Sequence, residues 1–217
     1  LHFAGRPESL LMDEITAVLG DLPVVATSYV QPDEIQVRLR VDDRPAAAAA
    51  PLLDQATRRI VAKEGAYYFG SGEGVTLAGQ VVKLLAAAKL TITAAESLTG
   101  GLFQSTLCGV SGASKVFAGG FVTYAARAKT KLVGVPAELI AEHGVVSAET
   151  AAAMATGARE TIGADLGVAF TGVAGPDPLE GQPAGTVYEA IAQAGQPAAA
   201  WRLDLAGCRG RLGVRQQ

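Results

Sequence analysis

Hydrophobic and polar positions repeat with two periods in the first 70 residues. Residues 9–19 place apolar side chains at helical spacing, and a serine and a glycine are set to begin and end that helix. Residues 34–41 alternate strictly, and together with the apolar run at 23–30 they predict a hairpin with one buried face and one wet face. A helix around residues 51–63 and a short strand at 66–69 complete a small αββαβ module.

Beyond this module, helical segments alternate with apolar strand-like runs. The strand candidates are residues 90–95, 116–124, 165–171, 186–193 and 199–205. The helix candidates are residues 75–88, 97–107, 126–142 and 148–161. This alternation predicts an α/β sandwich in which helices cover a sheet. Gly70, Gly72 and Gly74 make a flexible break, so we expect two domains, residues 1–72 and 73–217.

Composition narrows the class of protein. The chain has 217 residues, a net charge of −3 and a pI near 5.4, so it lacks the basic surplus that nucleic-acid binding needs. Cys108 and Cys208 are too few for a disulfide framework and fit a reducing compartment. The sequence has no signal peptide and no apolar run of about 20 residues that would span a bilayer. We therefore expect a cytoplasmic protein with no membrane and no nucleic-acid partner. The start at Leu1 predicts a fragment of something longer.

The most informative segment runs from Leu90 to Gly101, where an apolar strand leads into Glu96-Ser97 and then into a glycine pair. The first turn of a helix offers unpaired N–H groups that favour negative charge, and glycines let a ligand approach the backbone. A serine at such a point can act as a nucleophile beside an oxyanion hole. The alternative is that Ser97 only caps the helix.

A serine nucleophile needs a base. His143 lies in a turn with no motif around it, so a Ser-His-Asp triad has little support. Tyr124, at the end of an apolar strand, and Lys129, in the helix that follows, are the better candidates. A lysine that is partly desolvated can lose its proton near neutral pH and activate a hydroxyl. Alternatively, Lys129 is a solvated residue like its neighbours Arg127 and Lys131.

A third segment, from Phe170 to Pro176, again ends an apolar strand with a threonine and glycines. In open α/β sheets, ligands gather outside the carboxyl ends of strands, so this loop and the Ser97 turn are expected to converge. Alternatively, each segment is an ordinary glycine turn. The sequence carries no phosphate-binding fingerprint and no spacing typical of metal ligands, so we expect neither a metal nor a cofactor.

These motifs resemble a known family. The sequences Ala94-Ala-Glu-Ser-Leu-Thr-Gly-Gly101, Gly119-Gly-Phe-Val-Thr-Tyr124, Thr171-Gly-Val-Ala-Gly-Pro176 and Gly185-Thr-Val-Tyr188 are similar to successive motifs of the CinA C-terminal domain family. The resemblance implies a three-layer α/β/α sandwich that forms dimers or larger homo-oligomers. The family includes nicotinamide-nucleotide amidohydrolases (PncC), which convert nicotinamide mononucleotide and water to nicotinate mononucleotide and ammonia. The implied partner is thus a small pyridine nucleotide.

Residues 1–72 resemble the small KH-like middle module of full-length CinA proteins. Such proteins carry a further N-terminal domain that resembles molybdopterin-binding proteins, and this domain is absent from the sequence. The module is acidic and has no basic G-x-x-G loop, so its KH resemblance does not indicate RNA binding.

Carried over onto this chain, the family's catalytic residues fall on Ser97, Tyr124 and Lys129. The resemblance then implies that Lys129, assisted by Tyr124, takes the Ser97 proton during attack on the nicotinamide carbonyl. The expected substrate-binding residues are Thr99, Gly100, Gly101, Ser114, Thr171, Gly172, Gly175 and Arg209. The N–H groups around Thr99, Gly100 and Gly101 are expected to hold the oxyanion.

The sequence departs from the family in places. Leu98 stands where many members have cysteine, and the loop at 177–183 is less glycine-rich than usual. Cys208 replaces the acidic residue of the family's Gly-Asp-Arg turn, which leaves Arg209 as the candidate for the substrate phosphate.

A second functional hypothesis is a non-catalytic nucleotide-binding or regulatory module of a competence-associated protein. A third, RNA binding through the first module, requires a basic face.

Overall fold

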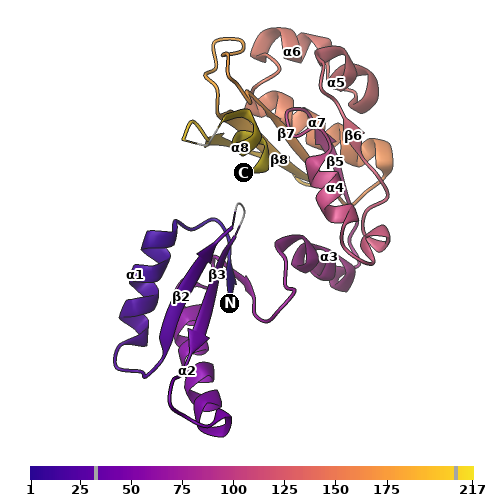
Figure 1. Ribbon diagram of the computed structural model, residues 1–217. Coiled ribbons are helices and arrows are strands. Elements are labelled where there is room, and N and C mark those ends of the chain that lie inside the picture. Colours follow the sequence, from indigo (N-terminus) through magenta and orange to yellow (C-terminus); the bar gives the residue numbers. More distant parts are fainter. Residues whose placement is uncertain (32–33, 208–209) are drawn as a thin grey trace. The chain divides into compact units, whose positions relative to one another are not determined.

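The structure is a computed structural model that describes residues 1–31, 34–207 and 210–217. These residues form two compact units, Leu1–Gln80 and Val81–Gln217. Each unit contains one β-sheet (Figure 1). The protein is therefore of the mixed α/β class, with a small sheet module ahead of a larger α/β unit.

The first unit is built on a four-stranded antiparallel sheet. Its elements are β1 (His2–Phe3), α1 (Glu8–Leu19), β2 (Val25–Val30), β3 (Ile35–Arg40), α2 (Ala46–Glu64) and β4 (Tyr68–Gly70). The strand order is β2-β3-β1-β4, and the predicted hairpin is the β2–β3 pair. Phe3, Leu11, Ile15 and Ile60 are fully buried in the core that the two helices form with the sheet.

Two features of this unit differ from the prediction. The αββαβ pattern omits β1, which lies between β3 and β4, because two residues are too few to show a period. Helix α2 begins at Ala46 rather than near residue 51, directly after Pro45. The alanine run at 46–50 therefore forms the first turns of the helix, as its high helix propensity favours.

The second unit is built on a mixed five-stranded sheet. It contains most of α3 (Leu77–Ala88) and then β5 (Ile92–Glu96), α4 (Leu102–Cys108), the 3-10 helix η1 (Ala113–Lys115), β6 (Phe121–Val122), α5 (Ala126–Val133), α6 (Ala137–His143), α7 (Ala148–Ile162), β7 (Leu166–Gly172), β8 (Thr186–Gln193), β9 (Ala199–Asp204) and α8 (Gly210–Gln216). The strand order is β6-β5-β7-β8-β9. Strands β6, β5 and β7 are parallel, whereas β8 and β9 are antiparallel to their neighbours. The carboxyl ends of three neighbouring strands thus meet at one edge of the sheet.

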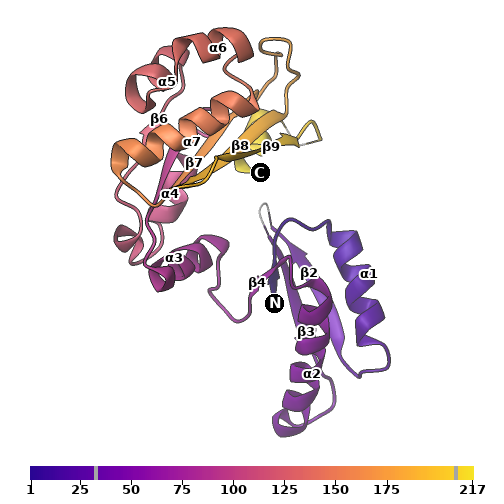
Figure 2. The same cartoon turned by 180° about the vertical axis from the view of Figure 1, so that it is seen from behind.

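Helices cover both faces of this sheet, as Figures 1 and 2 show. On one face, α7 packs through Ala151, Met154 and Ala155 against strand residues such as Ala169, and α5 and α6 flank it. On the other face, α3 and α4 enclose a second core that includes Leu107. The predicted three-layer α/β/α arrangement is confirmed.

Three predicted elements are shorter than expected. The segment at 97–107 is helical only from Leu102, and the strand at 116–124 is reduced to β6 and an isolated bridge between Ile92 and Phe117. The helix at 126–142 is broken into α5 and α6. Gly134 ends α5 in a left-handed conformation with φ 66°, and Pro136 caps α6.

Candidate active site

Ser97 lies directly after β5, where the strand turns toward α4. Its N–H donates to the carbonyl of Phe170 on the neighbouring strand β7, at 2.9 Å. Its side chain is almost completely buried, with 8% of the residue exposed. Because Ser97 is separated from α4 by four residues, it does not cap that helix in the structure.

The Glu96 carboxylate, which is fully buried, takes the place that an anion would occupy at the start of α4. It accepts hydrogen bonds from the N–H groups of Gly101 (2.8 Å), Gln104 (3.0 Å) and Phe103 (3.3 Å). The first turn of the helix is therefore satisfied by the protein itself. The sequence pattern predicts an anion site at these helix amides and indicates no role for Glu96.

The amides near Ser97 also differ from the expected oxyanion hole. The N–H of Gly100 donates to the carbonyl of Ser97 at 3.1 Å, and that of Gly101 is held by Glu96. Within the part of the chain that the structure describes, the N–H groups of Leu98 and Thr99 have no acceptor. Of these two residues Leu98 lines the cavity, so its amide, rather than those of the glycine pair, is available to a ligand beside Ser97.

Lys129 of α5 lies beneath Ser97 and is buried, with 1% of the residue exposed. Its Nζ lies 3.0 Å from Ser97 Oγ and donates to the carbonyl of Thr123 at 2.8 Å. Burial lowers the pKa of the Lys129 ammonium from 10.5 to about 8, and the negative charge of Glu180 partly opposes this effect. No carboxylate among the described residues lies within ion-pair distance of Lys129. The site therefore holds a lysine that can lose its proton near neutral pH, in contact with a serine.

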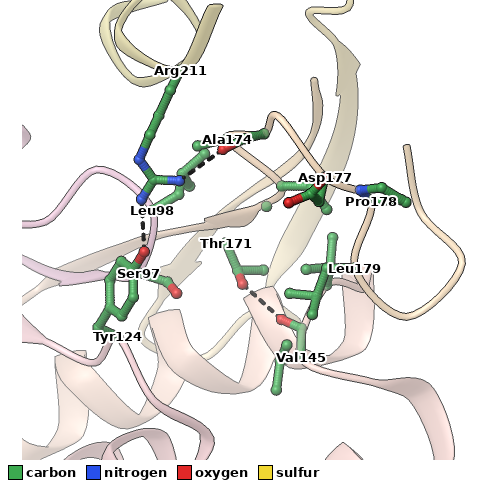
Figure 3. A pocket seen from close by; sticks show the side chains of 14 residues that line it. Ser97, Leu98, Tyr124, Val145, Thr171, Ala174, Asp177, Pro178, Leu179 and Arg211 are labelled. Atoms are coloured by element: carbon green, nitrogen blue, oxygen red, sulfur yellow. Dashed lines mark hydrogen bonds between the residues drawn. The ribbon is translucent and has the colours of Figure 1, made fainter. Parts of the chain in front are cut away.

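Tyr124, which follows β6, points toward the opening of the site and is 60% exposed. Its hydroxyl accepts a hydrogen bond from Arg211 Nη2 at 2.7 Å (Figure 3). Arg211 Nη1 donates to the carbonyl of Gly175 at 3.1 Å. The partner of the Tyr124 hydroxyl is thus Arg211, and no hydrogen bond joins Tyr124 to Lys129 in the described part of the chain. No local motif of the sequence predicts Arg211 as a site residue.

A cavity of about 220 Å³ opens beside Ser97, and Figure 3 shows the side chains around it. Its lining includes Tyr124, Thr171, Gly172 and Gly175 of the predicted residues. These residues follow β6 or lie at the end of β7, so the strand ends converge as predicted.

The cavity wall opposite Ser97 is fixed by hydrogen bonds. Thr171 Oγ1 donates to the carbonyl of Val145 at 2.6 Å, and the N–H of Val145 donates to Glu180 Oε2 at 2.7 Å. Glu180 belongs to the exposed loop at 176–183, whose Leu179 also lines the cavity. The loop is thereby joined to the segment between α6 and α7.

Other predicted residues lie away from the cavity. Thr99, Gly100 and Gly101 belong to the turn behind Ser97 and do not line it. Ser114 is exposed on η1, next to Val116, whose carbonyl accepts from the N–H of Ile92 at the start of β5. Ser114 thus lies near the start of β5, whereas Ser97 lies directly after its end. Arg209 lies outside the described residues.

Of two further basic side chains, Arg215 supports the site and His143 lies outside it. Arg215 of α8, which was not among the predicted substrate-binding residues, donates to the carbonyls of Leu98 (2.9 Å) and Thr99 (3.0 Å). It therefore holds the turn that carries Ser97. His143, the alternative base, is exposed next to Glu142 and does not line the cavity.

Among residues 1–31, 34–207 and 210–217, no three His, Cys, Asp or Glu side chains gather where they could hold a metal ion. No helix in these same ranges is both long enough and apolar enough to cross a bilayer.

Fold and site together define a three-layer α/β domain with a buried serine–lysine pair at the ends of parallel strands. Solved structures share this fold. The competence damage-inducible protein A (ComA) of Klebsiella pneumoniae matches 64% of this chain and 86% of its own, with TM-score 0.62 and 33% identity. A competence-damaged protein (CinA) superfamily protein of Escherichia coli matches 68% of this chain and 89% of its own, with TM-score 0.60 and 35% identity.

Sequence comparison agrees with the structural neighbours. Residues 75–217 match the CinA C-terminal domain. A competence-damage inducible protein of Limosilactobacillus fermentum is 56% identical over 217 residues, which are 100% of this chain and 52% of that protein. Its counterpart in Limosilactobacillus reuteri is 53% identical over 216 residues. The chain belongs to the CinA family, and it spans about half the length of the curated relatives it matches.

Proposed function

We propose that this chain hydrolyses the carboxamide of nicotinamide mononucleotide to nicotinate mononucleotide and ammonia. The observation that carries the proposal is the contact of 3.0 Å between Lys129 Nζ and Ser97 Oγ, made by a lysine whose pKa is lowered to about 8. A serine with a buried base in contact is the arrangement that nucleophilic catalysis requires. The resemblance to nicotinamide-nucleotide amidohydrolases supplies the substrate.

The proposed chemistry begins with the neutral amine of Lys129. With a pKa near 8, about a tenth of the side chain is neutral at pH 7. One of its N–H groups donates to the carbonyl of Thr123, which leaves the lone pair free to accept the Ser97 proton. Ser97 Oγ then attacks the carboxamide carbon, and the carbonyl oxygen becomes negatively charged.

We assign the oxyanion to the N–H group of Leu98, because Leu98 lines the cavity and the N–H groups of Gly100 and Gly101 are engaged. The amide after the nucleophile plays this part in other serine hydrolases. The Lys129 ammonium returns its proton to the leaving nitrogen, so that ammonia departs and an ester on Ser97 remains. A water molecule, deprotonated by Lys129, then hydrolyses that ester. Lys129 supplies the base in both steps, and the proposed reaction requires no metal.

The role of Tyr124 differs from the one that the resemblance implied. Its hydroxyl accepts from Arg211, so its own proton is free to be donated into the cavity. We assign it to contact the substrate beside Ser97 rather than to assist Lys129. The cytoplasmic location and a homo-oligomeric assembly stay predictions of the sequence.

The test is ammonia release from nicotinamide mononucleotide by the purified chain, with and without a chelator. Ser97→Ala should abolish release, and Ser105→Ala, which changes an exposed serine of α4, should leave it intact. Release that resists the chelator and disappears with Ser97 supports the proposal. Nucleotide binding without release by the unmodified chain would instead favour a non-catalytic, regulatory module, and near-normal turnover by Ser97→Ala would exclude the assigned nucleophile.

A further inference from the structure

Helix α8 holds the turn that follows Ser97 at Leu98, through the side chain and through the backbone. The Leu98 side chain is buried in the same small core as Val214 of α8. The next residue of α8, Arg215, donates from Nε to the Leu98 carbonyl at 2.9 Å. Among the hydrogen bonds of the described residues, this is the one that the Leu98 carbonyl accepts. Two successive residues of α8 therefore fix Leu98.

The turn itself determines where the Leu98 N–H points. The N–H of Gly100 donates to the carbonyl of Ser97 at 3.1 Å, so residues 97–100 form a β-turn that this bond closes. The C=O and the N–H of a trans peptide point in opposite directions, so the Leu98 N–H points away from the interior of the turn. Leu98 lines the cavity, and its N–H has no acceptor within the described ranges. A free donor therefore follows the nucleophile directly.

Arg215 fixes the middle peptide of this turn, between Leu98 and Thr99. Its Nε binds the Leu98 carbonyl, and its Nη2 binds the Thr99 carbonyl at 3.0 Å. The guanidinium is a rigid planar fork, so the two carbonyls are held in one orientation. Turns of types I and II differ in the orientation of the middle peptide, which is set by the backbone of Leu98 and Thr99. A rotation of this peptide would break the bond to Arg215 and change the backbone of Leu98, and with it the position of the Leu98 N–H.

We propose that Arg215 is a positioning residue that presets the Leu98 N–H for the oxyanion formed during attack by Ser97. The inference rests on the proposed function, which supplies the nucleophile and the oxyanion donor. Arg215 does not line the cavity, so it acts through the two carbonyls and not on the substrate. A preset donor needs no reorganisation during the reaction, so its loss weakens the transition state more than the binding of substrate.

The first test is the effect of Arg215→Ala on ammonia release from nicotinamide mononucleotide. The variant should lower kcat about 10- to 100-fold and leave KM nearly unchanged, because a misplaced donor weakens the transition state alone. Arg215→Lys should restore part of the loss, since an ammonium lacks the fork that binds both carbonyls. Methylguanidinium added to Arg215→Ala should also raise kcat, which a general loss of stability would not permit. Arg202→Ala, which removes an exposed arginine of β9, is the control and should keep the kcat of the unmodified chain.

The second test uses an alkyl fluorophosphonate and needs no nicotinamide substrate. Ser97 Oγ forms a bond to phosphorus, fluoride leaves, and the serine proton passes to Lys129. The phosphonyl oxygen takes the place of the oxyanion, so Arg215→Ala should be labelled about 10- to 100-fold more slowly, as measured by intact mass. Ser97→Ala should not be labelled. Urea unfolding followed by Trp201 fluorescence checks that each variant is folded under the assay conditions.

Three results for Arg215→Ala would overturn the inference: unchanged labelling and turnover, a loss confined to KM, or a loss that methylguanidinium does not restore and that accompanies partial unfolding. The last result would mean that Arg215 only stabilises α8. Failure of the proposed function is read separately. A chain that is labelled at Ser97 at a rate that depends on Arg215, but releases no ammonia, would retain the inference and lose the amidohydrolase proposal. A chain that is neither labelled nor active would overturn both.

Discussion

Lys129→Met separates the stability cost of the buried amine from its chemical role. Methionine has a similar length and no charge, so it fills the same space under Ser97. The variant should lose ammonia release, because a general base contributes about 100- to 10,000-fold to a rate. It should also lose a specific pH dependence of folding stability that the unmodified chain possesses.

The magnitude follows from the pKa of Lys129. A change from 10.5 to about 8 means that the folded state holds the ammonium about 3 kcal/mol less favourably than the unfolded state. Between these two values the unfolded chain binds more protons, so stability rises as the pH rises. Below about pH 8 both states are protonated and the penalty is constant. From about pH 7 to about pH 9.5 the expected gain is about 2 kcal/mol.

Urea unfolding at several pH values measures this gain. The single tryptophan, Trp201, lies on β9, so its fluorescence reports on the second unit alone. Other groups also titrate in this range, but they are common to the two proteins and cancel in the difference. Lys131→Met, which changes an exposed lysine of the same helix, is the matched control and should follow the unmodified chain.

The reasoning is refuted if the stability of Lys129→Met and that of the unmodified chain change in parallel with pH. Such a result would mean that Lys129 keeps an ordinary pKa in the folded state. The base assigned to Ser97 would then lack its neutral fraction of about a tenth at pH 7, and the proposed mechanism would lose its first step.

Two further predictions concern carboxylates. The value of kcat/KM should rise with pH with an apparent pKa near 8. Glu180→Gln removes a negative charge that raises the pKa of Lys129, so this variant should shift the profile to lower pH. Glu138→Gln on α6 is the control and should leave the profile in place. A profile that keeps its position in Glu180→Gln would contradict this coupling. Glu96→Gln replaces a carboxylate that accepts three backbone N–H groups, and it should cost about 1–3 kcal/mol in urea unfolding and lower kcat. Glu149→Gln, which changes an exposed residue in the first turn of α7, is its control, and equal stability of the two variants would exclude the assigned role.

Local pattern was sufficient for most of the fold. The strands β5, β7, β8 and β9 carry long apolar runs, and the sequence places each of them within a few residues. Periodicity did not predict the boundary of a helix where a side chain outside that helix binds its first amides. Helix α4 begins at Leu102 because Glu96 reaches past Ser97 to bind its first amides, and no periodicity shows that contact.

Some residues of the candidate site were predictable from local motifs, and others were not. Motifs that follow strands pointed to Ser97, Tyr124 and Thr171, because the carboxyl ends of neighbouring parallel strands must lie together. Arg211 meets Tyr124 across 87 residues of sequence, and nothing local to α8 distinguishes it from other arginines. Partners of that kind are set by tertiary packing, which a single sequence does not display.

The Arg215 contacts set a time order for the maturation of the site during synthesis. The guanidinium that fastens the turn after Ser97 follows Leu98 by 117 residues. A ribosome that has already made Ser97, Tyr124 and Lys129 must therefore complete β7, β8 and β9 before that fastening becomes available. In a nascent chain, the turn after Ser97 therefore lacks its two Arg215 hydrogen bonds until the last helix of the chain has been made.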